Sequence, residues 1–393
     1  MSEAFDKVDP TPTDWKADAM QRLIRKRYSA ERRFRLVGLA AVLMSAGFLA
    51  FLIAAMLAKG ATGFVRTEIR LDIGPAQAAM IAAGDYEGAV GQGSAGLYSD
   101  SAWLTLRQAG VRQGILWLPA ADAIDVAAKG PGTPEAERVY RALAGEGRTR
   151  TGINWTFLTG SDATDPTVVG IWGAFKGSLL TMIVTLLLAF PIGVLSAVYL
   201  EEYAPRNRWT DMIEVSINNL AAVPSIIFGL LGLAIFLNFM HLPRSAPLVG
   251  GITLALMTMP VIVIAGRNAI KSVPPSIRDA ALGIGASRIQ VVFHHVLPLA
   301  LPGILTGTII GMARALGETA PLLMIGMRAF IAAPPGGFQE PATALPVQIF
   351  LWSDEVSRGF VEKTSAAIIV LLVFLLAMNG LAIYLRNRFE KRW

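Results

Sequence analysis

Two charged residues stand inside an otherwise uncharged apolar stretch of the sequence. Arg314 and Glu318 lie within residues 299–327, which hold no other charge. Because a charge inside a membrane span is costly unless it faces a cavity or a partner, the two are a functional candidate by default. On a helix, their i, i+4 spacing places both side chains on one face, about 6 Å apart, where they can pair. The guanidinium can be offered to a passing anion while the carboxylate holds it or competes for it, and the alternative is a salt bridge that only fixes helix packing.

Groups that could perform catalysis are scarce elsewhere in the chain. His294 and His295 are adjacent, so on a helix they diverge by about 100° and cannot share a metal as an i, i+4 pair would. The sequence has no His-Glu-x-x-His, no Gly-x-Ser-x-Gly and no Gly-Lys dipeptide of a nucleotide-binding loop. It also has no cysteine, which excludes disulfides and thiolate chemistry. We therefore expect a chain that is not an enzyme and binds no cofactor or metal, so any ATP must be bound by another polypeptide.

The composition predicts that these residues are positioned by membrane helices. Of the 393 residues, 53% are hydrophobic and 16% are charged, against about 45–50% and about 25% in soluble domains. Only helices satisfy the backbone of an isolated span in lipid, and each needs about 20 residues to cross a core about 30 Å thick. Six transmembrane helices and an all-α fold are predicted. The spans are residues 36–58, 177–200, 215–240, 245–266, 299–327 and 364–385.

Basic residues flank the first and the last predicted span. Residues 21–35 carry seven lysines and arginines, and residues 386–393 carry four. Since basic residues favour the cytoplasmic side, both ends are expected in the cytoplasm, with residues 36–58 as a retained signal anchor. The net charge of +6 is then explained by orientation and contact with anionic lipid rather than by nucleic-acid binding. Arg314 would lie roughly 24 Å along its helix from Pro298, in the outer half of the bilayer.

The predicted topology divides the chain into five parts. Residues 59–170 are long enough to form a small extracytoplasmic domain without disulfides, with helices expected at 74–83 and 133–144. The parts are a basic N-terminal segment 1–35, an anchor helix 36–58, the extracytoplasmic domain 59–170, a five-helix core 171–386 and a tail 387–393. Prolines at 191, 224, 260 and 302 fall inside four spans and predict kinked, closely packed helices.

The cytoplasmic loop 271–298 has the pattern of an elbow. Two prolines followed by Ser276 predict a helix start, and residues 277–282 form a short amphipathic segment. Small residues, Gly285 among them, permit close approach to another surface. A helix–Gly–helix elbow of this kind is suited to insert into a groove on a partner, although an inert loop is the alternative.

This loop resembles the EAA loop of ABC-importer permeases, whose pattern is Glu-Ala-Ala, three residues, Gly, nine residues and Ile-x-Leu-Pro. Asp279 replaces Glu and keeps the carboxylate, whereas His295 replaces Ile and loses an apolar contact. The resemblance implies a coupling helix that docks into a cleft of an ATPase subunit, with Asp279 as a cap or salt-bridge partner and Gly285 as the bend. The implied coupling residues are Asp279, Ala280, Ala281, Gly285, Leu297 and Pro298.

Two further segments are similar to the permease subunits of phosphate ABC importers (PstA subunits). Residues 314–322 resemble a signature of that family, and residues 218–229 resemble its Pro-Ser-Ile-x-x-Gly element. The likeness covers about residues 170–390 and implies a type I importer bundle in the bacterial inner membrane, with Arg314 and Glu318 in the substrate path. It also implies a PstC-like second permease, two copies of a PstB-like ATPase and an extracytoplasmic PstS-like phosphate-binding protein. Residues 59–170 fall outside the compact pattern and look like an extended N-terminal variant of it.

Other interpretations stay open at this point. The same architecture could import another oxyanion or nutrient. A membrane sensor that binds a ligand through residues 59–170 belongs to a different class, as does a membrane-embedded hydrolase, which the missing nucleophile and base argue against. Arg267 and Asn268 could line an exit, but a snorkelling arginine is favoured. Interhelical hydrogen bonds are expected for Asn218, Asn219 and Asn379.

Overall fold

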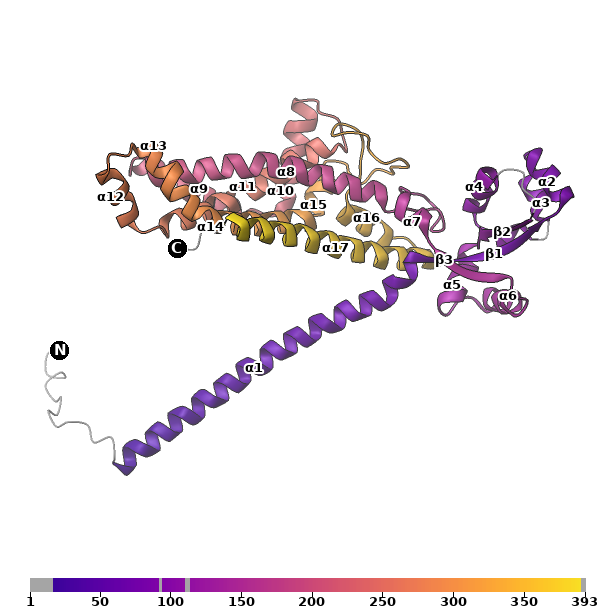
Figure 1. Ribbon diagram of the computed structural model, residues 1–393, viewed down its shortest axis with the longest axis horizontal. Coiled ribbons are helices and arrows are strands. Elements are labelled where there is room, and N and C mark those ends of the chain that lie inside the picture. Colours follow the sequence, from indigo (N-terminus) through magenta and orange to yellow (C-terminus); the bar gives the residue numbers. More distant parts are fainter. Residues whose placement is uncertain (1–16, 92–93, 110–113, 390–393) are drawn as a thin grey trace. The chain divides into compact units, whose positions relative to one another are not determined.

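The computed structural model describes residues 17–91, 94–109 and 114–389, and it divides the chain into residues up to Met56 and residues from Leu57 onward (Figure 1). In the first part, helix α1 (Asp18–Gly60) contains both the basic segment 21–35 and the predicted anchor 36–58. The basic run is therefore helical and continuous with the span. Residues 1–16 of the predicted N-terminal segment and residues 390–393 of the predicted tail lie outside the described residues.

Among the described residues, five helices are long and apolar enough to span a membrane, and a bent pair makes up to six. This confirms the predicted all-α bundle. The elements of the bundle and its connecting loops, from residue 172 onward, are α8 (Trp172–Val198), η3 (Tyr199–Tyr203), α9 (Arg208–Ala221), α10 (Ser225–Gly232), η4 (Leu233–Phe239), α11 (Pro247–Lys271), α12 (Pro275–Gly283), α13 (Arg288–Gln290), η5 (Val291–Val296), α14 (Leu297–Gly317), α15 (Ala320–Met324), α16 (Leu345–Ser353) and α17 (Arg358–Phe389).

The predicted span 215–240 is wrong as a single helix. Helices α9 and α10, the latter continued by η4, meet at a bend of 100°. Pro224 lies at the break, because it has no N–H to donate and it disfavours helical geometry in the residue before it. The other three prolines stay inside their helices; they are Pro191, Pro260 and Pro302.

The predicted span 299–327 is also interrupted. Helix α14 ends at Gly317, and Glu318 is extended (φ −78°, ψ 119°) before the short α15. At its other end the helix continues back to Arg288 through α13 and η5. Pro298 therefore does not begin the helix as expected. Pro298 has no N–H to donate to a carbonyl of the preceding turn, and that turn, η5, is a π-helix.

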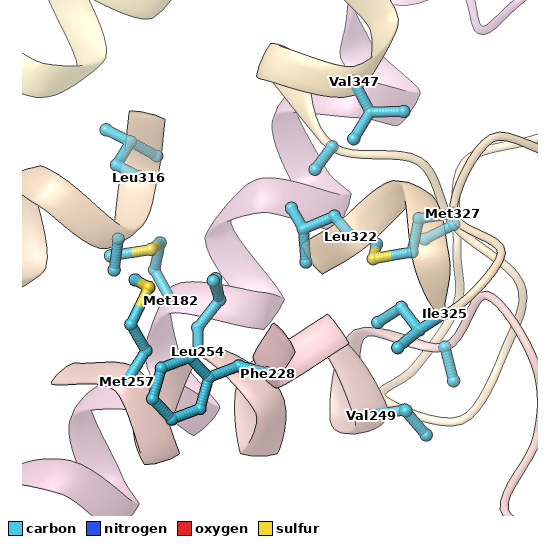
Figure 2. Close-up of a cluster of buried hydrophobic side chains, with 14 of the residues drawn as sticks. Met182, Phe228, Val249, Leu254, Met257, Leu316, Leu322, Ile325, Met327 and Val347 are labelled. Atoms are coloured by element: carbon cyan, nitrogen blue, oxygen red, sulfur yellow. The ribbon is translucent and has the colours of Figure 1, made fainter. Parts of the chain in front are cut away.

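Helix α11 lies at the centre of the bundle, packed against α8, α9 and α14. Glycines let these helices approach closely: a β-carbon on Gly251 would stand 2.4 Å from Val184 on α8. Figure 2 shows the buried cluster that joins α8, α10, α11, α14 and α15. Among its members are Met182, Phe228, Leu254, Leu316 and Leu322. This cluster fixes the end of α14, where Arg314 lies.

The described part of residues 61–159 forms an α/β domain, in which the sequence analysis predicted no sheet. Strand β1 (Val65–Ile73) lies between β2 (Gly114–Pro119) and β3 (Thr149–Ile153), antiparallel to both, and Ile69 stands opposite Leu118 and Thr149. The expected helices at 74–83 and 133–144 are α2 (Pro75–Ala82) and α6 (Pro134–Gly145). The remaining helices are α3 (Tyr86–Val90), α4 (Asp100–Ala109), α5 (Asp122–Lys129) and α7 (Trp155–Thr159), with η1 (Ala61–Phe64) and η2 (Ala95–Leu97).

A buried ion network joins this α/β domain to the first turns of α17. Lys129, at the end of α5, pairs with Asp125 at 2.6 Å and with Glu362 of α17 at 3.2 Å. Ser357, just before α17, donates a hydrogen bond to Asp122 at 3.1 Å. The α/β domain and α12 consequently lie at opposite ends of the bundle (Figure 1).

Candidate functional site

The loop after α11 folds into the predicted elbow. Helix α12 begins directly after Pro274, and its first residue is also a proline, which suits a position whose N–H has no helical partner. The helix ends at Gly283, and Gly285 turns the chain with φ +89°, a conformation that glycine adopts without strain. Ser287 then starts α13 through a capping box with Gln290.

The elbow buries one face and exposes the other. Ala281 is buried among the bundle residues, whereas Asp279, Ala280 and Gly285 are exposed. The side chain of Ile284, at the tip, is 83% exposed, and Leu282 beside it is also exposed. The outer face of the elbow therefore presents apolar side chains at its tip.

Asp279 is not the cap of α12, and a salt bridge with a partner subunit, the other role that the resemblance implies, stays a prediction. Asp279 lies inside α12 rather than at its start, and it makes no hydrogen bond or ion pair with any other residue that the structure describes. Leu297 and Pro298 are half-buried at the start of α14, away from the exposed tip. Of the predicted coupling residues, those on the outer surface of the elbow are therefore Asp279, Ala280 and Gly285.

Arg314 and Glu318 do pair, but not along one continuous helix. The Nε atom of Arg314 lies 3.4 Å from Oε1 of Glu318, which reaches back from the first residue after α14. The Arg314 side chain is 47% exposed and that of Glu318 is 18% exposed. A guanidinium has five N–H donors, and among the residues that the structure describes Arg314 uses one of them, in this contact.

Residues 218–229 and 314–322, the two segments that resemble PstA subunits, lie in contact in the structure. A β-carbon on Gly229, in α10, would stand 2.6 Å from Cα of Pro321 and 2.9 Å from Cβ of Met324, both in α15. The half-helix after the Pro224 break therefore supports the segment that carries Glu318. Asn218 and Asn219 are exposed on α9, and neither makes the expected interhelical hydrogen bond with a described residue.

Arg267 and Asn379 also differ from their expected roles. Arg267 does not snorkel: its side chain is 12% exposed and pairs with Glu201 at 3.4 Å and with Glu214 at 2.8 Å. Asn379 Oδ1 is buried without a hydrogen-bond partner among the described residues. Asn268 is exposed beside Arg267. Within the part of the chain that the structure describes, no three His, Cys, Asp or Glu residues are placed to hold a metal ion.

Sequence reasoning missed the ion pairs that hold the elbow. Glu201 and Glu202 lie on η3, at the end of α8, and Glu202 pairs with Arg278 of α12 at 2.7 Å. Two adjacent acidic residues after a predicted span, with an arginine in the loop 271–298 expected on the same side of the membrane, are a signal that could have been used.

Comparison with known proteins yields two family matches. Residues 166–392 match the family described as "Binding-protein-dependent transport system inner membrane component". Residues 21–94 match a domain of unknown function, DUF3333. The first match contains all the membrane helices from α8 to α17, with both candidate sites.

Individual relatives are permeases. The chain is 34% identical over 172 residues to the probable ABC transporter permease protein YqgI of Bacillus subtilis, which covers 44% of this chain and 58% of that protein. It is 31% identical over 206 residues to phosphate transport system permease protein PstA 1 of Mycobacterium tuberculosis, a match that covers 52% of this chain and 66% of that protein. It is 30% identical over 211 residues to PstA of Haemophilus influenzae, a match that covers 53% of this chain and 73% of that protein. The chain thus spans less than two thirds of the length of the first two relatives.

Among solved structures, the inward-facing MetNI methionine ABC transporter matches with a TM-score of 0.44 at 16% identity, over 60% of this chain and 97% of that chain.

Proposed function

Because the chain belongs to the family of inner membrane components of binding-protein-dependent transport systems, we propose that it is a permease subunit of an ATP-driven phosphate importer. The chain is a multi-pass membrane protein and a transport component rather than an enzyme. The relatives named as phosphate permeases support phosphate as the solute. The observation that carries the proposal is Arg314, a half-exposed arginine at the end of an apolar helix that bonds only Glu318 among the described residues.

Arg314 is proposed to bind phosphate as it crosses the membrane. A planar guanidinium matches two oxygens of a phosphate and binds them through parallel hydrogen bonds. Glu318 neutralises Arg314 when no phosphate is present, and its carboxylate repels the anion, so that phosphate must displace it. Because Glu318 follows the end of α14 and Gly229 supports the next segment, a shift of α10 against α15 changes the Arg314–Glu318 distance.

The elbow is proposed to couple this path to a separate ATPase. The exposed side chains of Ile284 and Leu282 insert into a cleft of that subunit, Asp279 supplies a carboxylate to it, and Gly285 gives the turn its shape. By the preference of basic residues for the cytoplasmic side, both chain ends and the loop that carries α12 face the cytoplasm in this proposal. The partners are a PstC-like second permease, two PstB-like ATPases and an external PstS-like binding protein.

Uptake of labelled phosphate tests the proposal in bacterial cells that lack their own importer and produce this chain with the proposed partners. Arg314→Gln is expected to abolish uptake while the complex still assembles. Arg206→Gln serves as the matched control, because Arg206 is exposed in the loop after η3 and makes no hydrogen bond or ion pair with a described residue. Near-normal uptake by the Arg314 variant would refute the role of this residue in the path.

Import of a different oxyanion is the second candidate. The name of the Bacillus subtilis relative, a probable ABC transporter permease, states no solute and so leaves this candidate open. Competition separates the two candidates. An excess of molybdate, sulfate or phosphonate should leave phosphate uptake unchanged, and suppression by one of these anions at concentrations equal to phosphate would identify the other substrate.

A further inference from the structure

We infer that Arg278 and Glu202 form a clamp that transmits movement of the coupling helix α12 directly to the end of α8. The inference rests on the proposed function, since it concerns how the coupling helix works. Nη2 and Nε of Arg278 lie 2.7 Å and 3.1 Å from Oε1 of Glu202. The two side chains are 22% and 12% exposed, so water competes little for this pair.

The same guanidinium also holds the end of α11. Its Nη1 donates to the carbonyl of Val273 at 2.7 Å, and its Nη2 donates to the carbonyl of Ile270 at 3.0 Å. Helix α11 ends at Lys271, and the Ile270 carbonyl also accepts a hydrogen bond from the backbone N–H of Val273 at 3.2 Å. Arg278 adds a second donor to this carbonyl, bonds the linker at Val273, and so joins α8, α11 and α12 through one side chain.

The two glutamates on η3 hold different partners. Glu201 pairs with Arg267 and Lys271 of α11, and Arg267 also pairs with Glu214 of α9. These contacts connect membrane helices to one another. Glu202, the next residue, connects α8 to the elbow instead.

This arrangement gives the coupling helix a non-covalent connection to a helix distant in sequence. Through the chain itself, α12 reaches only α11, through residues 272–274, and α14, through residues 284–296. A charge-assisted, two-bond contact between partly buried groups is short and directional. A push on α12 is thereby applied to α8, which packs along α11 across the bundle.

Replacing the arginine by lysine tests the clamp, because Arg278→Lys keeps the charge but removes the planar fork. In purified complexes in lipid vesicles, the number of solute molecules imported per ATP hydrolysed is expected to fall about fivefold or more, a size typical of coupling between sites. ATPase association and the rate of hydrolysis should be retained. A residue that only stabilises the fold would lower assembly and both rates together, leaving the ratio unchanged. Arg206→Lys, on the neighbouring loop, should leave every quantity at the wild-type value.

Cross-linking gives a second test that does not depend on side-chain charge. The wild-type chain has no cysteine, so a Glu202→Cys, Arg278→Cys double variant carries the only two thiols. Its import per ATP should be low when the thiols are reduced and should recover when a short bifunctional thiol reagent joins them. Failure of the reagent to restore the ratio would contradict transmission through this contact.

The outcomes separate the clamp from the proposed function. If the wild-type complex imports phosphate and Arg278→Lys imports it with an unchanged ratio, the clamp is refuted and the proposed function stands. If the wild-type complex imports another oxyanion, the ratio is measured with that solute, so the clamp is still tested. If the chain associates with no ATPase, both are refuted.

Discussion

Arg314 and Arg267 are both arginines of apolar helices, yet their surroundings give them different roles. Arg267 is nearly enclosed and is neutralised by carboxylates on two other elements, at 3.4 Å and 2.8 Å. Arg314 is about half exposed, with one carboxylate at 3.4 Å. A charge that is fully paired and enclosed serves packing, whereas an exposed one in a membrane helix needs water or a solute nearby. The contrast supports Arg314 as the residue that meets the solute.

Gly285 provides a residue-scale prediction about the elbow. Its φ of +89° is a conformation that costs an L-residue about 1–2 kcal/mol, and no atom lies within 4 Å of the position a β-carbon would take. Gly285→Ala should therefore act through the backbone alone, changing the turn and reducing both the ATPase that co-purifies and the uptake. Gly283→Ala is the matched control, since Gly283 also has open space but lies in α12, where alanine is favoured. Equal uptake by the two variants would contradict the role of the turn.

At the scale of elements, the sequence predicted where the chain is apolar better than where helices stop. Residues 215–240 and 299–327 both read as uninterrupted spans, and both are broken. Pro224 marks the first break, but Pro191 lies inside α8 without ending it, so proline alone does not decide. At the second break, Pro321 lies four residues after Gly317 and has no N–H to donate to the Gly317 carbonyl, so α14 ends there. Contacts with neighbouring helices decide such cases, as Gly229 against Pro321 illustrates, and these contacts are not visible in a single sequence.

The contact between α10 and α15 gives the prediction at this scale. Gly229→Ala places a methyl group 2.6 Å from Cα of Pro321, a backbone atom that cannot turn aside. Overpacking of this kind costs about 1–3 kcal/mol, and the displaced α15 segment should alter the position of Glu318. We expect a lower thermal midpoint of the detergent-solubilised protein and reduced uptake.

A glycine with open space supplies the control for this substitution. Gly380 lies in α17, and a β-carbon added there would meet no atom within 4 Å. Gly380→Ala should keep or slightly raise the thermal midpoint, because alanine is the better helix former. A midpoint for Gly229→Ala as high as that of Gly380→Ala would show that α10 and α15 are not in tight contact.

At the scale of the whole molecule, the α/β domain is attached to the bundle through side chains as well as through the chain. Helix α17 has 32 residues and rises about 48 Å, more than the roughly 30 Å of a hydrocarbon core. Its first turns can therefore extend beyond the membrane to meet α5. The sheet of this domain escaped prediction although buried and less buried residues alternate over the second half of β1, residues 69–73. The adjacent apolar span and the surrounding helical segments obscured that short pattern.

The ion network at this joint predicts a large stability effect. Lys129 is the cation between Asp125 and Glu362, and its side chain is 7% exposed. Lys129→Met leaves the carboxylates of Asp125 and Glu362 close together without a cation between them. Loss of one partner of a buried ion pair lowers the free energy of unfolding by about 3–5 kcal/mol. The thermal midpoint should fall, and protease should cut the α/β domain from the bundle faster. Lys129→Met combined with Asp125→Asn and Glu362→Gln should recover much of the loss, whereas no recovery would mean that the charges are not the cause.

Asp122 makes the same joint sensitive to pH. Burial raises the pKa of its carboxyl above the ordinary value, with the neighbouring Asp165 and Asp125 adding to the rise and the Ser357 hydrogen bond and Lys363 opposing it. The folded state therefore binds this proton more tightly than the unfolded state does. Its contribution to stability is fully present below the ordinary pKa of aspartate and is lost as the pH rises through the raised value.

Asp122→Asn removes this titration while keeping a side chain that can accept the Ser357 hydrogen bond. The thermal midpoint of the variant, relative to that of the wild type, should be higher at neutral pH than at pH 4, because only the wild type loses stability as the carboxyl ionises. Asp85→Asn is the comparison, since Asp85 caps α3 in the same domain at an exposed site. An Asp122 variant whose midpoint differs from that of the wild type by the same amount at both pH values would show that the joint does not favour the protonated carboxyl.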